Sequence, residues 1–289
     1  MANFKLFIDA EADFYYNIPS PHFSKIDMVK WKLNKLRGKA YRYPNPSRKG
    51  IENIIKILNK YKFPATFCFC GHLYLKECSG WQHFDEIKPQ ANWYKNKIGK
   101  DWYYWDKGGN FKTKPGLYMG DLIEDISSNE NFEFGLHSFT HEALTLESKE
   151  TVDSIINAGM KAAKERGIIP TSFGAPFEMI SDTRDPNKVF DVLRKYKLKN
   201  VQFSGQDTNL TIHRKFDITK IKKENNLNIH WISNYLEGTD PNKKIKTIIK
   251  GIKSTTKTDK TYILATHDFT WKNTKKLELL IKKIQSLQR

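Results

Sequence analysis

The sequence alternates between short apolar strands and amphipathic helices along most of its length, and this alternation limits the fold more than any other feature. Alternating or continuous apolar residues predict strands at 5–9, 65–70, 133–137, 171–176, 201–204, 228–233 and 261–267. Apolar residues at helical spacing predict helices at 48–61, 120–126, 148–167, 187–196, 242–257 and 274–284. A strand followed by a helix, repeated about seven times, favours a largely parallel sheet that forms a closed or partly closed barrel.

One segment, 79–114, interrupts this alternation. It is too long for an ordinary connection, and it is rich in aromatic side chains, including Trp81, Trp93, Trp102, Tyr103, Tyr104 and Trp105. These rings would suit the faces of sugars if they are exposed, or they would form a small core if the loop packs on itself, and the sequence leaves both interpretations open. No internal repeat or low-complexity linker marks a second domain, so we expect the 289 residues to form one domain.

The chain lacks the apolar runs of a membrane protein. It contains no run of about 18 apolar residues, and its start, MANFKLFIDAEADF, has acidic residues where a signal peptide needs an apolar core. We therefore expect a globular protein with a cytoplasmic location and no stable membrane insertion. Cys68 and Cys70 alternate with phenylalanines as one face of a buried strand, so neither disulfides nor zinc–thiolate sites are expected.

The formal net charge of +17 raises the question of a polyanionic partner. Much of the excess positive charge lies in the C-terminal third, where the lysines of 242–257 would occupy the solvent-exposed face of an amphipathic helix. Nothing resembles a nucleic-acid-binding motif, and the diffuse pattern favours solvated helix faces over a nucleic-acid site. Attraction to a negatively charged glycan or lipid head group stays open.

Acidic and imidazole side chains follow the predicted strands, at the place where α/β folds hold their chemistry. Asp9, Glu11 and Asp13 share one face if the first strand stays extended, and three crowded carboxylates repel one another. A divalent cation would remove that conflict. His137 ends a later strand and His141 lies in the turn after it, in GLHSFTHE. Because imidazole with carboxylate is a recurring ligand set for catalytic zinc, we expect a metal site here.

These motifs resemble those of the polysaccharide deacetylase superfamily, which has the NodB-homology fold. FIDAEADF is similar to its first motif, HSFTH to its second, and ILATHD, which contains His267, to its last. The strand ATFCFC and the aromatic segment before LYMGDLIEDI also resemble parts of the family. The resemblance implies a distorted (β/α)7-type barrel with mostly parallel strands, and a single catalytic domain over residues 1–289 that includes the aromatic-rich insertion.

The resemblance also implies an activity and a cofactor. The chain is expected to be a metal-dependent hydrolase that removes an N-acetyl group from an amino sugar or a polysaccharide. Its divalent ion, with zinc as the expected metal, would be held by Glu11, His137 and His141. The D-x-E-x-D spacing leaves Asp13 as a rival to Glu11.

Further roles follow from the same resemblance. It implies that Asp9 is the general base and His267 the general acid, with Asp268 or another carboxylate holding the imidazole in position. The backbone N–H of Phe177 is expected to stabilise the oxyanion. His72, just past a strand end, would either line the pocket or make a turn hydrogen bond, and the second interpretation is favoured.

One position departs from the family pattern. Many relatives have an arginine in a motif like RxPxG, which orients the catalytic base, whereas this chain reads FGAPFE with Gly174 at that position. Arg184, a few residues later, is a candidate to reach Asp9 instead, or no arginine is needed. The sequence does not decide between these alternatives.

Two other functions stay open. The same fold hydrolyses other C–N amide bonds in the superfamily, including those of cyclic ureides and formylated amino sugars. A glycan-binding protein that has lost turnover would fit the missing arginine, whereas the three strand-end histidines favour the hydrolase. A nucleotide-linked or lipid-linked amino sugar is a hypothesis for the substrate that fits the basic surface.

Overall fold

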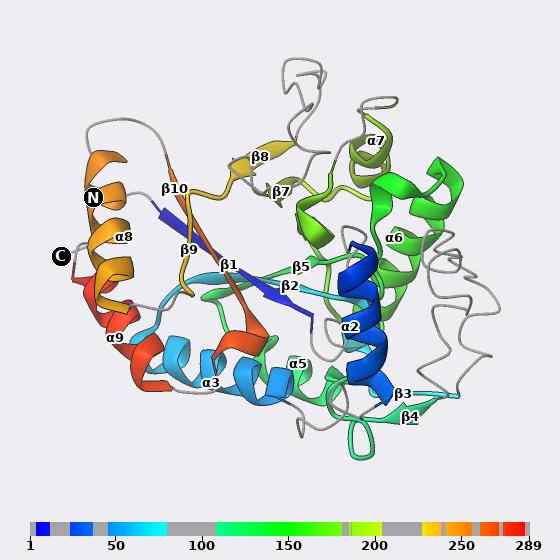
Figure 1. Ribbon diagram of the computed structural model, residues 1–289, viewed down its shortest axis with the longest axis horizontal. Helices are drawn as coiled ribbons and strands as arrows, with labels where there is room; N and C mark the ends of the chain where they lie inside the picture. Colours follow the sequence, from blue (N-terminus) through cyan, green and yellow to red (C-terminus); the bar gives the residue numbers. More distant parts are fainter. Residues whose placement is uncertain are drawn as a thin grey trace.

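The computed structural model describes a curled sheet of eight strands (Figure 1). The described residues are 4–11, 24–36, 46–79, 108–180, 185, 187–203, 227–237, 241–255, 261–271 and 274–286. The strands are β1 (Phe4–Ala10), β2 (Ala65–Phe69), β5 (Phe132–Leu136), β6 (Ser172–Gly174), β7 (Asn200–Phe203), β8 (Asn228–Trp231), β9 (Asn234–Tyr235) and β10 (Tyr262–His267). Their order is β8-β7-β6-β5-β2-β1-β10-β9, and every adjacent pair is parallel. The predicted parallel α/β barrel is therefore confirmed, as a curled sheet with β8 and β9 at its edges.

Helices cover the outer face of this sheet (Figure 1). They are α3 (Pro46–Tyr61), α5 (Gly120–Ile126), α6 (Lys149–Lys164), α7 (Lys188–Lys195), α8 (Pro241–Thr255) and α9 (Thr274–Gln285). A further helix, α2 (Lys25–Leu36), was not expected from the sequence, and a separate two-stranded sheet pairs β3 (Glu77–Cys78) with β4 (Gly109–Asn110). No helix in the described part of the chain is both long and apolar enough to cross a membrane.

The strands bury both of their faces, but they bury them against different partners. On β1, Leu6 and Ile8 belong to the main core beneath the helices. Phe7, between them, lies in a second and smaller cluster on the inner face, which also contains Cys68, Ile232, Ile263 and Ala265. Because side chains alternate along a strand, the next inward position on β1 is Asp9, at the carboxyl end. The inner face thus changes from apolar to acidic where the strand ends.

Several local expectations are confirmed. The Ser148 hydroxyl caps α6 by accepting the N–H of Thr151 at 3.2 Å, and Gly167 follows that helix with a φ of +70°. Cys68 and Cys70 are buried free thiols. Within the predicted insertion the structure describes only 79 and 108–114, so the aromatic residues singled out between Trp81 and Trp105 lie outside the described residues.

Candidate functional site

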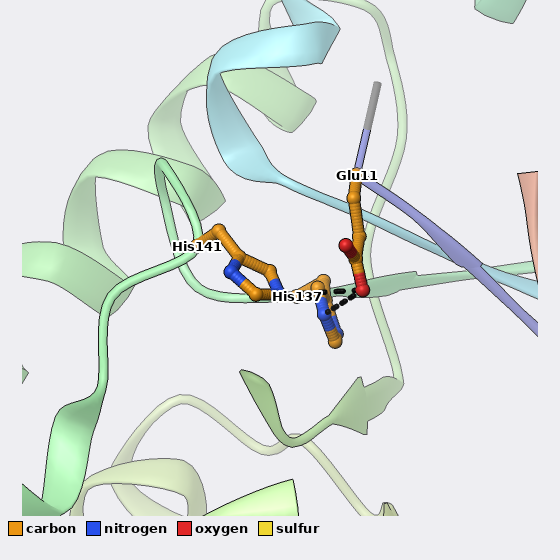
Figure 2. A group of neighbouring side chains, drawn as sticks. All are labelled: Glu11, His137 and His141. Atoms are coloured by element: carbon orange, nitrogen blue, oxygen red, sulfur yellow. Dashed lines mark ion pairs between the residues drawn. The ribbon is translucent and has the colours of Figure 1, made fainter. Parts of the chain in front are cut away.

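Three side chains meet at the carboxyl ends of β1 and β5 (Figure 2). Glu11 follows β1, His137 follows β5, and His141 lies in the turn that leaves β5. The Glu11 Oε1 lies 3.4 Å from the His137 Nε2 and 3.2 Å from the His141 Nε2. One ligand atom from each residue lies within 4.8 Å of the others. The parallel sheet makes this possible, because only β2 separates the two strands whose ends carry these residues.

The cluster has the buried, unpartnered atoms that a metal ion would satisfy. Glu11 Oε2, His137 Nε2 and both ring nitrogens of His141 are buried, and none has a hydrogen-bond partner among the described residues. Leaving such atoms without partners is costly unless a ligand takes their lone pairs. The His137 Nδ1 lies 3.1 Å from the Gly174 carbonyl, which selects the tautomer whose Nε2 carries a lone pair. The residues present therefore fit a divalent ion with nitrogen and oxygen ligands.

Electrostatics keep the acidic member of the cluster ionised. Burial opposes the charge on Glu11, but the nearby imidazoles, His141 foremost, outweigh burial and hold the pKa of this carboxyl well below its usual value. An ionised carboxylate is the form that binds a cation. Asp13, the rival ligand, lies outside the described residues, and Glu11 is the carboxylate that the described residues bring to the cluster.

The turn that carries His141 is held by a buried carboxylate. Ser138 and His141 both have left-handed backbone, with φ of +56° and +68°, which L-residues adopt only when the surroundings enforce it. Glu142 accepts the N–H groups of Phe139 at 2.9 Å and Thr140 at 2.8 Å, and its own N–H donates to the Ser138 hydroxyl at 2.9 Å. Sequence reasoning missed Glu142, although an acid directly after the histidine pair was visible. Glu142 therefore holds the backbone of the turn that carries His141.

Asp9 lies on the inner face at the end of β1 and is nearly inaccessible to solvent. Its Oδ1 accepts a hydrogen bond from the Gln202 Nε2 at 2.7 Å and lies 3.6 Å from the His137 Nδ1. Burial raises the pKa of Asp9 above its usual value, although the nearby histidines oppose that shift. A carboxyl with a raised pKa holds a proton more strongly than an ordinary aspartate does.

Gly174 leaves no room for the side chain that the family pattern places there. A Cβ on this glycine would lie 2.5 Å from the Asp9 Oδ1, 2.7 Å from the Gln202 Nε2 and 2.9 Å from the His137 Nδ1. Each of these distances is below normal contact. Gln202, which sequence reasoning treated only as part of a strand, fills this space from β7. Arg184 lies outside the described residues, so its predicted contact with Asp9 stays a prediction.

His267 ends β10 beside Asp9, its register partner on β1. The His267 Nδ1 lies 2.5 Å from the Glu237 Oε1, and its Nε2 faces the cluster, 3.7 Å from the Glu11 Oε1. Burial lowers the pKa of His267, but the hydrogen bond with Glu237 outweighs that effect, so the pKa lies well above its usual value. Glu237, rather than Asp268, is thus the carboxylate that holds the ring.

Two aromatic rings stack on this histidine. The Tyr235 ring stacks on the His267 ring at 5.5 Å between centroids, and the Phe269 ring stacks on it at 5.1 Å. The Tyr235 hydroxyl donates to the Glu178 carboxylate. The imidazole is therefore held by a carboxylate at one edge and by two ring faces, which limits the directions in which its Nε2 can point.

Phe177 lies beside the histidine pair, whereas His72 lies behind the turn. The Phe177 ring meets the His141 ring edge-on at 4.3 Å, and Phe177 has a φ of +54°. The His72 Nδ1 hydrogen-bonds to the Leu117 carbonyl at 2.8 Å, and its ring contacts Phe139. His72 is buried in this position, and its hydrogen-bond partner is 45 residues away along the chain rather than in its own turn.

Comparisons with known proteins agree with this fold. The sequence model of the family described as Polysaccharide deacetylase matches residues 41–185. A Mycobacterium smegmatis protein assigned as a polysaccharide deacetylase superposes with a TM-score of 0.56 at 14% identity, covering 99% of this chain and 85% of that chain. At this identity the likeness shows the fold alone. No curated protein sequence matches the chain.

Two further solved structures are similar at lower TM-scores. A family 4 carbohydrate esterase from Streptomyces lividans, in complex with acetate, has a TM-score of 0.46 at 10% identity, covering 99% of this chain and 89% of that one. A CE4-family pseudoenzyme from Bacillus anthracis has a TM-score of 0.49 at 12% identity, covering 99% of this chain and 61% of that one.

Proposed function

The chain belongs to the polysaccharide deacetylase family, and on that basis we propose that it is a metal-dependent hydrolase that removes an N-acetyl group from an amino sugar or a polysaccharide. We propose that the whole chain forms one catalytic domain. The observation that carries the proposal is the meeting of Glu11, His137 and His141 at one point, with Asp9 and His267 beside them. A binding protein has no need for a buried base and an acid next to a set of metal ligands.

We assign the metal site to Glu11, His137 and His141. The unpartnered ring nitrogens and carboxylate oxygen support this assignment, and the mixture of imidazole and carboxylate favours zinc. When bound, such an ion lowers the pKa of water and polarises a carbonyl group. Glu142 serves this site by fixing the turn that presents His141.

We assign Asp9 as the general base. Its buried carboxylate, with a raised pKa, accepts a proton from the water that attacks the amide carbonyl carbon. The new C–O bond produces a tetrahedral oxyanion. The backbone N–H of Phe177 is the chain's proposed donor to that oxygen, and the position of Phe177 against His141 supports this role.

We assign His267 as the general acid. Its raised pKa favours the protonated ring, and Glu237 holds Nδ1 so that Nε2 faces the site. When the C–N bond breaks, this Nε2 gives its proton to the departing nitrogen, because an amine leaves poorly unless it is protonated. The products are acetic acid, which ionises to acetate, and a free amino sugar. Asp9 then holds the proton taken from water, and its net transfer to His267 restores the site.

Metal analysis and acetate release test this function. The wild-type protein, purified without chelator, should contain about one divalent ion per chain, and His137→Ala with His141→Ala should lose it. His230→Gln changes a histidine outside the cluster and is the matched control. Asp9→Asn should keep the metal but release acetate from N-acetylated oligosaccharides about 10²–10⁴-fold more slowly.

The substrate assays separate the alternatives. Hydrolysis of a cyclic ureide or of a formylated amino sugar, without acetate release, would show that the proposed site hydrolyses a different amide substrate. Glycan binding without turnover of any of these substrates, in metal-loaded protein, would contradict the hydrolase proposal. An Asp9→Asn variant as active as the wild type would overturn the assignment of the base.

A further inference from the structure

We propose that Gln202 is the positioning residue of Asp9: its amide holds one carboxylate oxygen so that the other faces the attacking water. The inference rests on the proposed role of Asp9 as base. The Gln202 Nε2 donates to the Asp9 Oδ1 at 2.7 Å, and both side chains are buried. Because a carboxylate only accepts hydrogen bonds, it selects the amide orientation with Nε2 towards Asp9.

The contact crosses the inside of the curled sheet. Gln202 is on β7 and Asp9 on β1, and β6, β5 and β2 lie between these strands. In a flat sheet, four steps of about 4.8 Å would separate the two backbones by about 19 Å, which these side chains cannot span. Val201 and Phe203 join the helix-facing core, so alternation directs Gln202 to the inner face. The curl of the sheet and the alternation of side chains along β7 together bring the Gln202 amide to Asp9.

Gly174 is the second half of this arrangement. It is the register partner of Gln202 on the neighbouring strand β6, and a Cβ there would come within 2.7 Å of the amide nitrogen and 2.5 Å of the Asp9 oxygen. The absence of a side chain at Gly174 opens the path along which the longer side chain from β7 reaches Asp9. One residue clears the space and the other fills it.

Packing alone does not explain a glutamine in this place. Gln202 is 1% exposed, and its Oε1 has no hydrogen-bond partner in the described part of the chain. An apolar residue of similar volume would fill the same space without burying an unsatisfied carbonyl. What the amide provides, and an apolar residue would not, is the hydrogen bond to Asp9. Its acceptor is the carboxylate that we propose as the general base.

Kinetics of Gln202→Leu test the proposal in the metal-loaded protein. We expect kcat to fall about 10–100-fold while KM and metal content stay at their wild-type values, since the base is present but no longer held. In an Asp9→Asn background, Gln202→Leu should cause no further loss. Gln285→Leu, which removes the hydrogen bond that the Gln285 side chain on α9 donates to the Tyr61 carbonyl on α3, is the matched control and should leave kcat unchanged. An unchanged kcat in Gln202→Leu would overturn the proposal.

Two further experiments distinguish a positioning role for Gln202 from a general effect on folding and from a failure of the proposed function. Gln202→Asn keeps the amide but shortens it by one methylene, so a loss equal to that of Gln202→Leu supports positioning, and wild-type kcat contradicts it. If the wild-type protein releases no acetate with zinc, the proposed function has failed. Crystal structures of wild type and Gln202→Leu then decide the positioning by themselves: a turned or doubled Asp9 carboxylate supports it, and an unmoved one refutes it.

Discussion

Glu237 and His267 form a 2.5 Å contact between Oε1 and Nδ1 at the open edge of the sheet, just beyond β9 and at the end of β10. Glu237 Oε2 also accepts the hydroxyl of Thr266 at 2.7 Å, so both of its oxygens are engaged by the end of β10. The carboxylate therefore fixes the position of the ring and accepts the hydrogen bond from its Nδ1–H. A substitution of Glu237 should therefore change the pKa of His267, and with it the pH up to which the ring stays protonated.

Glu237→Gln should shift the pH profile of acetate release. Burial lowers the pKa of His267, and the hydrogen bond and charge of Glu237 raise it above the usual value. A raised pKa extends the protonated form to higher pH, so removal of the charge should move the alkaline limb of kcat to lower pH. We also expect kcat at its optimum to fall about tenfold. The check is the full pH profile beside that of Glu278→Gln, whose carboxylate pairs with Lys60. An alkaline limb at the wild-type position would contradict the role of Glu237.

Glu142→Ala should weaken both the fold and the metal site. The substitution removes the acceptor of two backbone N–H groups and the Thr140 hydroxyl, all of them buried. We expect the free energy of unfolding to fall by about 2–4 kcal/mol, because these donors lose a charged acceptor. Metal affinity should fall as well, since His141 is in the same turn. Urea unfolding and metal titration measure the two effects, with the exposed Glu165→Ala as control. Wild-type stability would show that other contacts hold the turn.

Removal of the metal should lower the melting temperature reversibly. An ion that binds only the folded state, present at 100 times its Kd, adds about 2.7 kcal/mol to the free energy of unfolding. Chelated wild-type protein should therefore melt earlier and recover when zinc is restored. His141→Ala should show no such dependence, because it lacks a ligand. Thermal melts with and without zinc measure this, and a zinc-independent wild type would contradict the metal site.

His230 should make the fold sensitive to acid. Burial, followed by the charge of Lys5, lowers the pKa of His230 from 6.5 to about 4. Between these values the unfolded chain binds a proton that the folded chain does not, so stability is present above pH 6.5 and is lost as the pH falls towards 4. The full shift corresponds to about 3 kcal/mol, and partial solvent access reduces it to about 1–2 kcal/mol. His230→Gln keeps the side chain polar beside Asn200 but cannot titrate. Urea unfolding at pH 7 and pH 4 should give a smaller difference for the variant than for the wild type, and equal differences would contradict the prediction.

The sequence predicted that Asp9, His137 and His267 would lie near one another because each of them stands at the end of a predicted strand. Asp9, His137 and His267 are polar residues directly after apolar runs, and a parallel sheet brings the carboxyl ends of its strands to one edge. That rule needs no knowledge of side-chain packing. It also predicted most element positions, such as 120–126 for α5 and 274–284 for α9, because their apolar periodicity is strong.

The sequence could not predict the partners of these residues. Gln202 reaches Asp9 only because the sheet curls, and Glu237 follows the two-residue strand β9, which is too short to show a period. Both contacts join side chains from different strands, and the order of these strands in the sheet cannot be predicted from the sequence. The helix α2 was missed for a different reason: its apolar residues Ile26, Val29 and Leu33 are exposed, so its pattern does not point to a core.

The crowding around Gly174 ties two positions of the chain together. Any residue larger than glycine at 174 collides with the amide of Gln202 and with the oxygen that this amide holds. A longer side chain at 174 therefore requires a different residue at 202, whereas a change at 202 alone removes the hydrogen bond to Asp9. Redesign of this site must exchange both residues together, because each single replacement either creates a collision or breaks that hydrogen bond.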